Sequence, residues 1–186
     1  MKMLNLNLII VFIAVYFVSI YFAYKFGYKK GKNYIIHNDS ENPKFWRSNR
    51  WKYEISFPSD WNPIKRGDKS IKSPDADIFC QSSRGYSCVV FVYKSLKSES
   101  LTQVSRNILQ QYKDQFGVNK IIKENEYIKN EISYRKIIFN RESMIHFYTF
   151  VIHNSYLYII SSNSPEEYFE TAEYDFDYII ESIKFF

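Results

Sequence analysis

The fold of this chain is decided by residues 145–160, which read IHFYTFVIHNSYLYII. Two almost continuously apolar runs, 145–152 and 156–160, flank a polar triplet at 153–155. Strands that are covered on both faces read as continuous apolar runs, whereas strands with one wet face alternate between polar and apolar residues. The two runs therefore predict neighbouring central strands of a sheet with other elements packed on both sides.

Further strands are predicted on either side of this centre. Residues 121–128 and 132–139 alternate polar and apolar residues, as half-buried strands do. Residues 78–80 and 88–93 are apolar runs separated by a polar loop, and this pattern predicts a hairpin.

The first strand of the folded part is expected at residues 53–57, where Tyr53, Ile55 and Phe57 alternate with polar residues. Pro58 ends this pattern, because proline cannot donate a hydrogen bond to a sheet. A loop is expected from Trp61 to Gly67. The strands counted in this way number about seven.

An amphipathic helix is predicted over residues 101–116, whose apolar side chains recur every three or four positions. Ser100 is followed three residues later by Gln103, the pattern of a capping box, and Gly117 can end the helix.

A second amphipathic helix is predicted near the end of the chain, with an apolar stripe from Phe169 to Ile183. Its start is expected at Ser164 as the N-cap, followed by Pro165 in the first turn. Residues 164–186 carry seven acidic residues and one lysine. This acidic helix is expected to be a solvated face or, alternatively, a ridge that docks a basic partner.

Together these elements predict an α+β fold: a mostly antiparallel sheet of about seven strands with two amphipathic helices packed on it, plus one N-terminal transmembrane helix. The predicted boundaries are 1–32 for a membrane anchor with a basic flank, 33–50 for a tether and 51–186 for the folded domain.

The anchor is predicted from residues 3–24, which contain no charged side chain. A helix of this length spans about 33 Å, enough to cross a hydrocarbon core of about 30 Å. A cleaved signal peptide is the alternative, but the apolar stretch is too long and lacks a cleavage site with small residues. We therefore expect an uncleaved single-pass anchor that places the protein in the cell (inner) membrane and contacts the bilayer through residues 3–24.

The side of the membrane on which the domain lies is open to two interpretations. Four lysines at 25–32 favour a cytoplasmic domain by the positive-inside rule. Cys80 and Cys88 favour the opposite side, because they bracket the hairpin loop and could form a disulfide, which persists only in an oxidising compartment. Two ordinary buried thiols are the alternative for this pair. We favour an extracytoplasmic domain.

The charge distribution argues against nucleic acid as a partner. The net charge is +5, but all 20 acidic residues lie at or beyond Asp39, and five lysines precede it. The remainder of the chain is therefore balanced and offers little attraction to phosphates. The motifs of zinc fingers and RNA-binding domains are absent from the sequence.

The sequence contains little that predicts catalysis. It has no glycine-rich phosphate loop, no His-Glu-x-x-His and no Cys-x-x-Cys, so we expect no cofactor and no metal. Asp75 and Asp77 lack a third ligand for a cation. The enzyme hypothesis that the residues allow is a membrane-bound hydrolase or thiol enzyme that uses Cys88 and His146. A histidine on an apolar strand face is more often part of the core.

Tryptophan and arginine gather where the folded domain begins. Trp46, Arg47, Arg50, Trp51 and Trp61 lie within sixteen residues. Exposed tryptophan and arginine are frequent anchors of protein interfaces, so these five residues are the predicted partner-binding surface. The alternative is that the tryptophans cap the edge of the sheet and bury the junction.

The opening YEISFPSDW (53–61) is similar to the strand-Phe-Pro-x-x-Trp opening of the PsbP-like superfamily, which includes DcrB-like proteins. The strand at 89–93 that leads into the helix at 101–116 also resembles this family, as does the terminal helix that ends at 180–185. The resemblance covers residues 51–186. It implies an α/β/α sandwich and a non-catalytic role, such as an accessory subunit, a partner-binding module or a chaperone.

The function predicted from the sequence is therefore a membrane-anchored, non-catalytic protein-binding domain. It would act as an envelope accessory or assembly factor, a chaperone or an immunity-type factor for a protein partner. The alternative is the enzyme that uses Cys88 and His146.

Overall fold

The computed structural model describes residues 43–65, 76–94, 100–118 and 120–186. The elements in chain order are β1 (Lys44–Ser48), β2 (Tyr53–Phe57), β3 (Trp61–Lys65), β4 (Ala76–Ser82), β5 (Ser87–Lys94), α2 (Leu101–Phe116), β6 (Lys120–Lys129), β7 (Ile132–Arg141), β8 (Met144–His153), β9 (Tyr156–Pro165), the 3-10 helix η1 (Glu166–Tyr168), α3 (Phe169–Glu181) and β10 (Lys184–Phe185).

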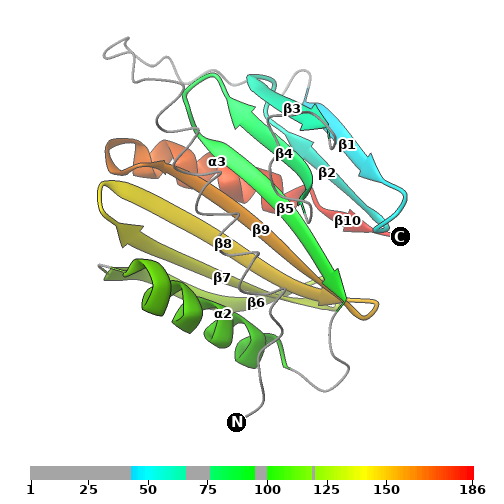
Figure 1. Ribbon diagram of the computed structural model, residues 1–186. Coiled ribbons are helices and arrows are strands. Elements are labelled where there is room, and N and C mark those ends of the chain that lie inside the picture. The colour runs from blue at the N-terminus through cyan, green and yellow to red at the C-terminus, as the bar shows by residue number, and fades with distance from the viewer. Residues whose placement is uncertain (1–42, 66–75, 95–99, 119) are drawn as a thin grey trace.

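The strands form two antiparallel sheets (Figure 1). The large sheet has seven strands in the order β3-β4-β5-β9-β8-β7-β6, and the small sheet has three in the order β1-β2-β10. The predicted α+β architecture with a seven-stranded antiparallel sheet and two helices is confirmed. The central position of β8 and β9 also agrees with the continuous apolar runs in their sequences.

The membership of the seven strands differs from the prediction. β2 was expected in the main sheet but belongs to the small one, and Trp61–Lys65 was expected to be a loop but forms β3. Pro63 favoured a loop in the prediction, but it pairs with Cys80 in the sheet. A proline is tolerated there because β3 is an edge strand, where one side of the backbone needs no partner.

The two helices pack on opposite faces of the large sheet. α2 contacts β7 and β8, whereas α3 contacts β9, β8 and β2. On β8 the buried Phe147 belongs to the core beneath α3, and its neighbour Tyr148 belongs to the core beneath α2. Successive strand residues point to opposite faces, so each helix covers its own apolar layer.

The helix starts show where local signals hold and where they fail. The Ser100 hydroxyl accepts a hydrogen bond from the Gln103 amide at 3.2 Å, as the capping box predicts. At α3 the expected N-cap is wrong: Ser164 pairs with Ile145 inside the sheet, and the helix follows only after η1. Strand pairing with β8 continues through Pro165, so pairing overrides the local capping pattern.

The folded part begins earlier than the predicted boundary at Trp51. β1 lies within the range assigned to the tether and pairs with β2 along its whole length. The predicted anchor at 3–24 and the first part of the tether lie outside the described residues. Neither helix in the described part of the chain is long and apolar enough to cross a bilayer.

Candidate functional site

The thiol and the imidazole of the enzyme hypothesis lie on opposite faces of the large sheet. Cys88 on β5 pairs with Ser162 on β9, which in turn pairs with Phe147 on β8. His146 is the neighbour of Phe147 and therefore points to the other face. The imidazole cannot serve as a base for the Cys88 thiol, and this contradicts the predicted hydrolase or thiol enzyme.

Burial also makes both groups unreactive. Desolvation raises the pKa of the Cys88 thiol well above its ordinary value. Desolvation, helped by the positive charge of Arg141, lowers the pKa of His146 to about 3. The imidazole stacks on the Phe139 ring with the centroids 5.1 Å apart. His146 is therefore a neutral core residue that packs among aromatic side chains.

The two cysteines lie directly opposite each other in the β4–β5 hairpin, as their spacing predicts. Both are buried and both are free thiols in the structure. Desolvation raises the pKa of Cys80 to about 12. Since the thiolate is the nucleophilic form, neither cysteine is poised for reaction.

The acidic pair Asp75 and Asp77 does not form a cation site in the described residues. Asp75 lies outside them, and Asp77 is a buried hydrogen-bond acceptor for Tyr53 Oη at 2.7 Å and Trp46 Nε1 at 3.4 Å. No group of three or more His, Cys, Asp or Glu side chains in the described ranges is placed to hold a metal ion.

Trp61 and Trp46 of the predicted surface serve mainly to pack the interior. Trp61 is 1% exposed and stacks on Phe57. Trp46 is half-buried and packs against the core on the α3 side. Trp61 therefore offers no area to a partner, and the alternative of a buried junction holds for this residue.

Two of the remaining predicted residues, the exposed Arg50 and the half-buried Trp51, lie at one corner of the molecule. Arg50 and Trp51 are in the turn between β1 and β2, and the Arg50 guanidinium lies over the Trp51 ring, 4.5 Å from its centroid. The Trp51 ring meets Tyr156 edge-on at 5.4 Å. Tyr156 follows the β8–β9 turn, so two turns distant in the sequence form what we call the Trp51 corner.

Arg47 points in a different direction, to the side of the small sheet that faces away from the core. It pairs with Glu54 at 3.0 Å, and its guanidinium lies over the Phe186 ring, 4.4 Å from the centroid. Phe45 lies on the same strand two residues earlier and is 58% exposed. Phe45 and Phe186 were not predicted from the sequence. Phe45 lies two residues before Arg47 in an otherwise polar stretch, and this pattern could have indicated it, whereas no local pattern indicates Phe186.

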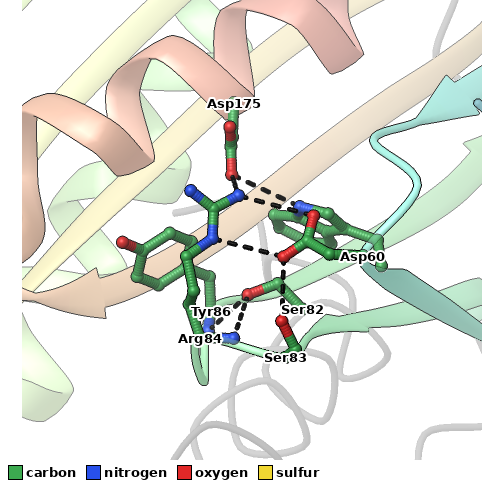
Figure 2. A network of polar contacts seen from close by, with 7 residues as sticks. Asp60, Ser82, Ser83, Arg84, Tyr86 and Asp175 are labelled. Atoms are coloured by element: carbon green, nitrogen blue, oxygen red, sulfur yellow. Dashed lines mark hydrogen bonds and ion pairs between the residues drawn. The ribbon is translucent and has the colours of Figure 1, made fainter. Parts of the chain in front are cut away.

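A second feature that the sequence analysis missed is a charged network around Arg84, the residue in the β4–β5 turn (Figure 2). Its guanidinium binds Asp60 through Nε at 3.2 Å and also binds Asp175 of α3. Trp61 donates from Nε1 to the same Asp175 oxygen at 3.4 Å, and Ser83 donates to Asp60 at 3.1 Å. The network joins the opening motif, the hairpin turn and the terminal helix, which are far apart in the sequence.

The Arg84 network holds parts of the fold together. Asp175 is 6% exposed, and desolvation raises the pKa of its carboxyl to about 6 although Arg84 and Trp61 oppose the shift. Two carboxylates share one guanidinium, and no thiol or imidazole in the described part of the chain binds either carboxylate.

Four of the five acidic side chains of α3, all except Glu170, are engaged within the molecule. Glu173 binds Lys123 at 3.0 Å and Lys136 at 3.1 Å, and Glu181 binds Lys129 at 2.7 Å. These lysines belong to β6 and β7. The alternative of an acidic ridge for a basic partner is therefore reduced to the exposed Glu166, Glu167 and Glu170, because the other carboxylates are paired within the domain.

The sequence matches no family model and no curated protein. Two solved structures share its fold. Cyanobacterial PsbP (CyanoP) from Synechocystis sp. PCC 6803 has a TM-score of 0.61 and 13% identity, over 84% of this chain and 98% of that one. The Ran-binding protein Mog1p of Saccharomyces cerevisiae has a TM-score of 0.55 and 10% identity, over 77% of this chain and 95% of that one. The fold implied by the PsbP-like resemblance is confirmed.

Proposed function

We propose that this chain, which folds like PsbP and the Ran-binding protein Mog1p, is a membrane-anchored, non-catalytic domain that binds a protein partner near the bilayer. It would act as an accessory, assembly, chaperone or immunity-type factor of the cell envelope. Residues 3–24 would anchor it in the inner membrane, with the folded domain on the extracytoplasmic side.

The shared fold and the chemistry of the described residues support the non-catalytic part of this proposal. Mog1p is a Ran-binding protein by name. In the residues that the structure describes, the candidate thiol and base lie on opposite faces of the sheet. A fold can serve recognition without catalytic residues. Its function then depends on the surface that it presents to a partner.

The Trp51 corner is the observation that carries the partner-binding part. Arg50 is exposed, and its guanidinium stacks on a tryptophan that is itself held by Tyr156. Rigid aromatic rings with a stacked arginine are typical anchors of protein interfaces, because little side-chain entropy is lost on binding. Of the predicted surface, Arg50 and Trp51 form this anchor and Trp46 supports the strand that leads to it.

The proposed membrane anchor at residues 3–24 would strengthen partner binding by proximity. A domain tethered to a membrane meets a partner in the same membrane at a high effective concentration, so a modest interface is sufficient.

Photo-crosslinking in intact cells tests the proposal. The photoreactive residue benzoylphenylalanine replaces the exposed Asn49, which lies beside Arg50 in the β1–β2 turn, in the full-length chain, and a matched control carries the same residue at the exposed Gln110 of α2. We expect a discrete adduct with one protein from position 49, its loss in Trp51→Ala, and no such adduct from position 110. The absence of an adduct at position 49, or the same adduct from both positions, would contradict the proposal.

A further inference from the structure

The side of the small sheet that faces away from the core has an unusual composition. Tyr53, Ile55 and Phe57 of β2 point into the core and are almost fully buried. The alternate positions point outward. We define the outer face as Phe45, Arg47, Lys52, Lys184 and Phe186, all of which are exposed.

The outer face presents two exposed aromatic rings, and one of them, Phe186, is in direct contact with cations. Phe45 is 58% exposed and Phe186 is 44% exposed. The Arg47 guanidinium lies 4.4 Å and the Lys52 ammonium 5.8 Å from the Phe186 ring centroid. The backbone amide of Phe186 donates to the Lys52 carbonyl at 3.1 Å, which fixes the ring beside these cations. The rings are therefore held outward.

The charge of this region is strongly positive. Among the side chains of residues 43–57 and 184–186, the basic ones are Lys44, Arg47, Arg50, Lys52 and Lys184, whereas Glu54 is the single acidic one. Glu54 is engaged by Arg47. The folded domain as a whole is balanced in charge, so the excess here is local and favours an anionic counterpart.

The size of the face indicates what kind of counterpart fits. Its longest strands have five residues, and it is three strands wide. At about 3.4 Å per residue and about 4.8 Å per strand it measures roughly 17 by 15 Å. A stable protein interface buries about 800 Å² on each partner, several times this area. The outer face is therefore too small for a stable protein interface on its own. It suits a contact that buries little area and that a tether holds in place.

The path of the chain supplies the tether. The described part begins at Pro43, directly before β1, so the preceding chain reaches the molecule at this same sheet. Only eighteen residues, 25–42, separate the uncharged stretch 3–24 from Pro43. Even fully extended, these residues span no more than about 65 Å. The outer face therefore remains within reach of the membrane that the anchor would enter.

We infer that the outer face of the small sheet docks on the headgroup region of an anionic bilayer, an inference that rests on the proposed anchor. Phe45 and Phe186 would enter the interface, and Arg47, Lys52 and Lys184 would pair with lipid phosphates, as aromatic and basic residues do at membrane surfaces. Docking would leave the Trp51 corner, at the end of the same sheet, at the height of the bilayer surface.

Site-specific quenching in vesicles tests this inference. The full-length chain carries a bimane label on Asn49→Cys, in the exposed β1–β2 turn, or on Gln110→Cys as the matched control. α2 lies far from the small sheet in Figure 1, and the native thiols are buried and escape labelling. Vesicles contain phosphatidylcholine alone or with an equal amount of phosphatidylglycerol, together with a nitroxide-headgroup lipid as quencher.

With phosphatidylglycerol we expect the label at position 49 to be quenched at least about threefold more than the label at position 110, and about 1 M salt to remove most of the difference. Phe45→Ser and the pair Arg47→Ser with Lys184→Ser are expected to return the quenching to the phosphatidylcholine level. All three substituted sites are exposed, and thermal unfolding of each variant checks that the fold is retained.

The alternative outcomes separate the inference from the proposed anchor. Protein that floats with vesicles after an alkaline wash but shows equal quenching in the two lipids overturns docking and leaves the anchor standing. If crosslinks from position 45 to a protein accompany that result, the outer face belongs to a protein partner.

Protein that washes off the vesicles overturns both proposals. Quenching that persists in the outer-face variants means that another surface meets the lipid, and docking through this face is wrong.

Discussion

At the scale of the residue, Asp175 gives the clearest dependence on pH. Burial raises the pKa of its carboxyl from 3.8 to about 6 in the folded protein. The folded state therefore binds this proton more tightly than the unfolded state, and the resulting stabilisation is complete below about pH 4 and is lost as the pH rises through 6. At neutral pH the protein retains a buried carboxylate that Arg84 only partly compensates.

Asp175→Asn is expected to remove this dependence. Urea unfolding at pH 4.5 and 7.5 would show the variant gaining about 1–2 kcal/mol relative to the parent between the two pH values, less than the full shift because the network is in part open to solvent. Asp177→Asn, on the other side of α3, is the control. A difference between parent and Asp175→Asn that does not change with pH would contradict the predicted proton uptake.

The thiols give a second prediction at this scale. Cys80 is 0% and Cys88 is 1% exposed, and burial raises the pKa of both. Native protein is expected to react with a maleimide at least about 100-fold more slowly than protein in denaturant, because both access and thiolate are lacking. Mass spectrometry of a timed reaction measures this. Rapid native labelling of either cysteine would show that the hairpin opens readily.

Residue-level features were predicted to different degrees. The register of Cys80 opposite Cys88 follows from a short hairpin loop, and the sequence was sufficient for it. The Arg84 network was not predictable, because Asp60, Arg84 and Asp175 come from three separate segments. No local sequence pattern predicts an ion pair between such distant segments. The only indication in the sequence was Arg84 itself, a single arginine in the predicted hairpin turn.

At the scale of the element, the attachment of α3 depends on one buried lysine. Lys136 of β7 has a side chain that is 5% exposed and binds both Glu173 and Asp177 of the helix. Burial raises the pKa of Glu173, but hydrogen bonds from Lys123 and Lys136 outweigh burial and hold it below its ordinary value. This carboxylate therefore stabilises the fold above its unfolded pKa, and the contribution is lost as the pH falls through the folded one.

We expect Lys136→Met to lower the free energy of unfolding by about 1–2 kcal/mol at neutral pH, because carboxylates of α3 lose their buried partner. The loss is expected to shrink as the pH falls through the lowered pKa of Glu173 and this carboxylate takes up a proton. Lys123→Met is the matched control: its side chain is 50% exposed, so a change of less than about 0.5 kcal/mol is expected. Equal effects of the two substitutions, measured by urea unfolding, would refute a special role for Lys136.

Elements were predictable where local signals and tertiary pairing agree. The helix Leu101–Phe116 was predicted with its cap, because Ser100 and Gly117 act within a few residues of it. The start of α3 and the strand β3 were missed for one reason: pairing with a distant strand decides both, against the local signals of Ser164 and Pro63. The small sheet was missed likewise, since β10 has two residues and no pattern of its own.

At the scale of the whole molecule, the sidedness of the domain is the prediction that decides its partners. In cells that express full-length Asn49→Cys, we expect a membrane-impermeant maleimide to label the exposed cysteine without permeabilisation, as an extracytoplasmic domain requires. The parent protein, whose two thiols are buried, serves as the blank. Labelling that appears only after permeabilisation would place the domain in the cytoplasm, with the lysines at 25–32 setting the orientation.

The position of β2 between β1 and β10 has a consequence for biosynthesis. β1 and β2 leave the ribosome early, but β10 follows every other described element, so the small sheet stays incomplete until all of them have been translated. Such distant pairing is slow to form, and unpaired strand edges are prone to wrong associations in the interval. With the proposed anchor inserted during translation, the open β2 edge would lie close to the lipid, and a chaperone that shields this edge would be needed most at that moment.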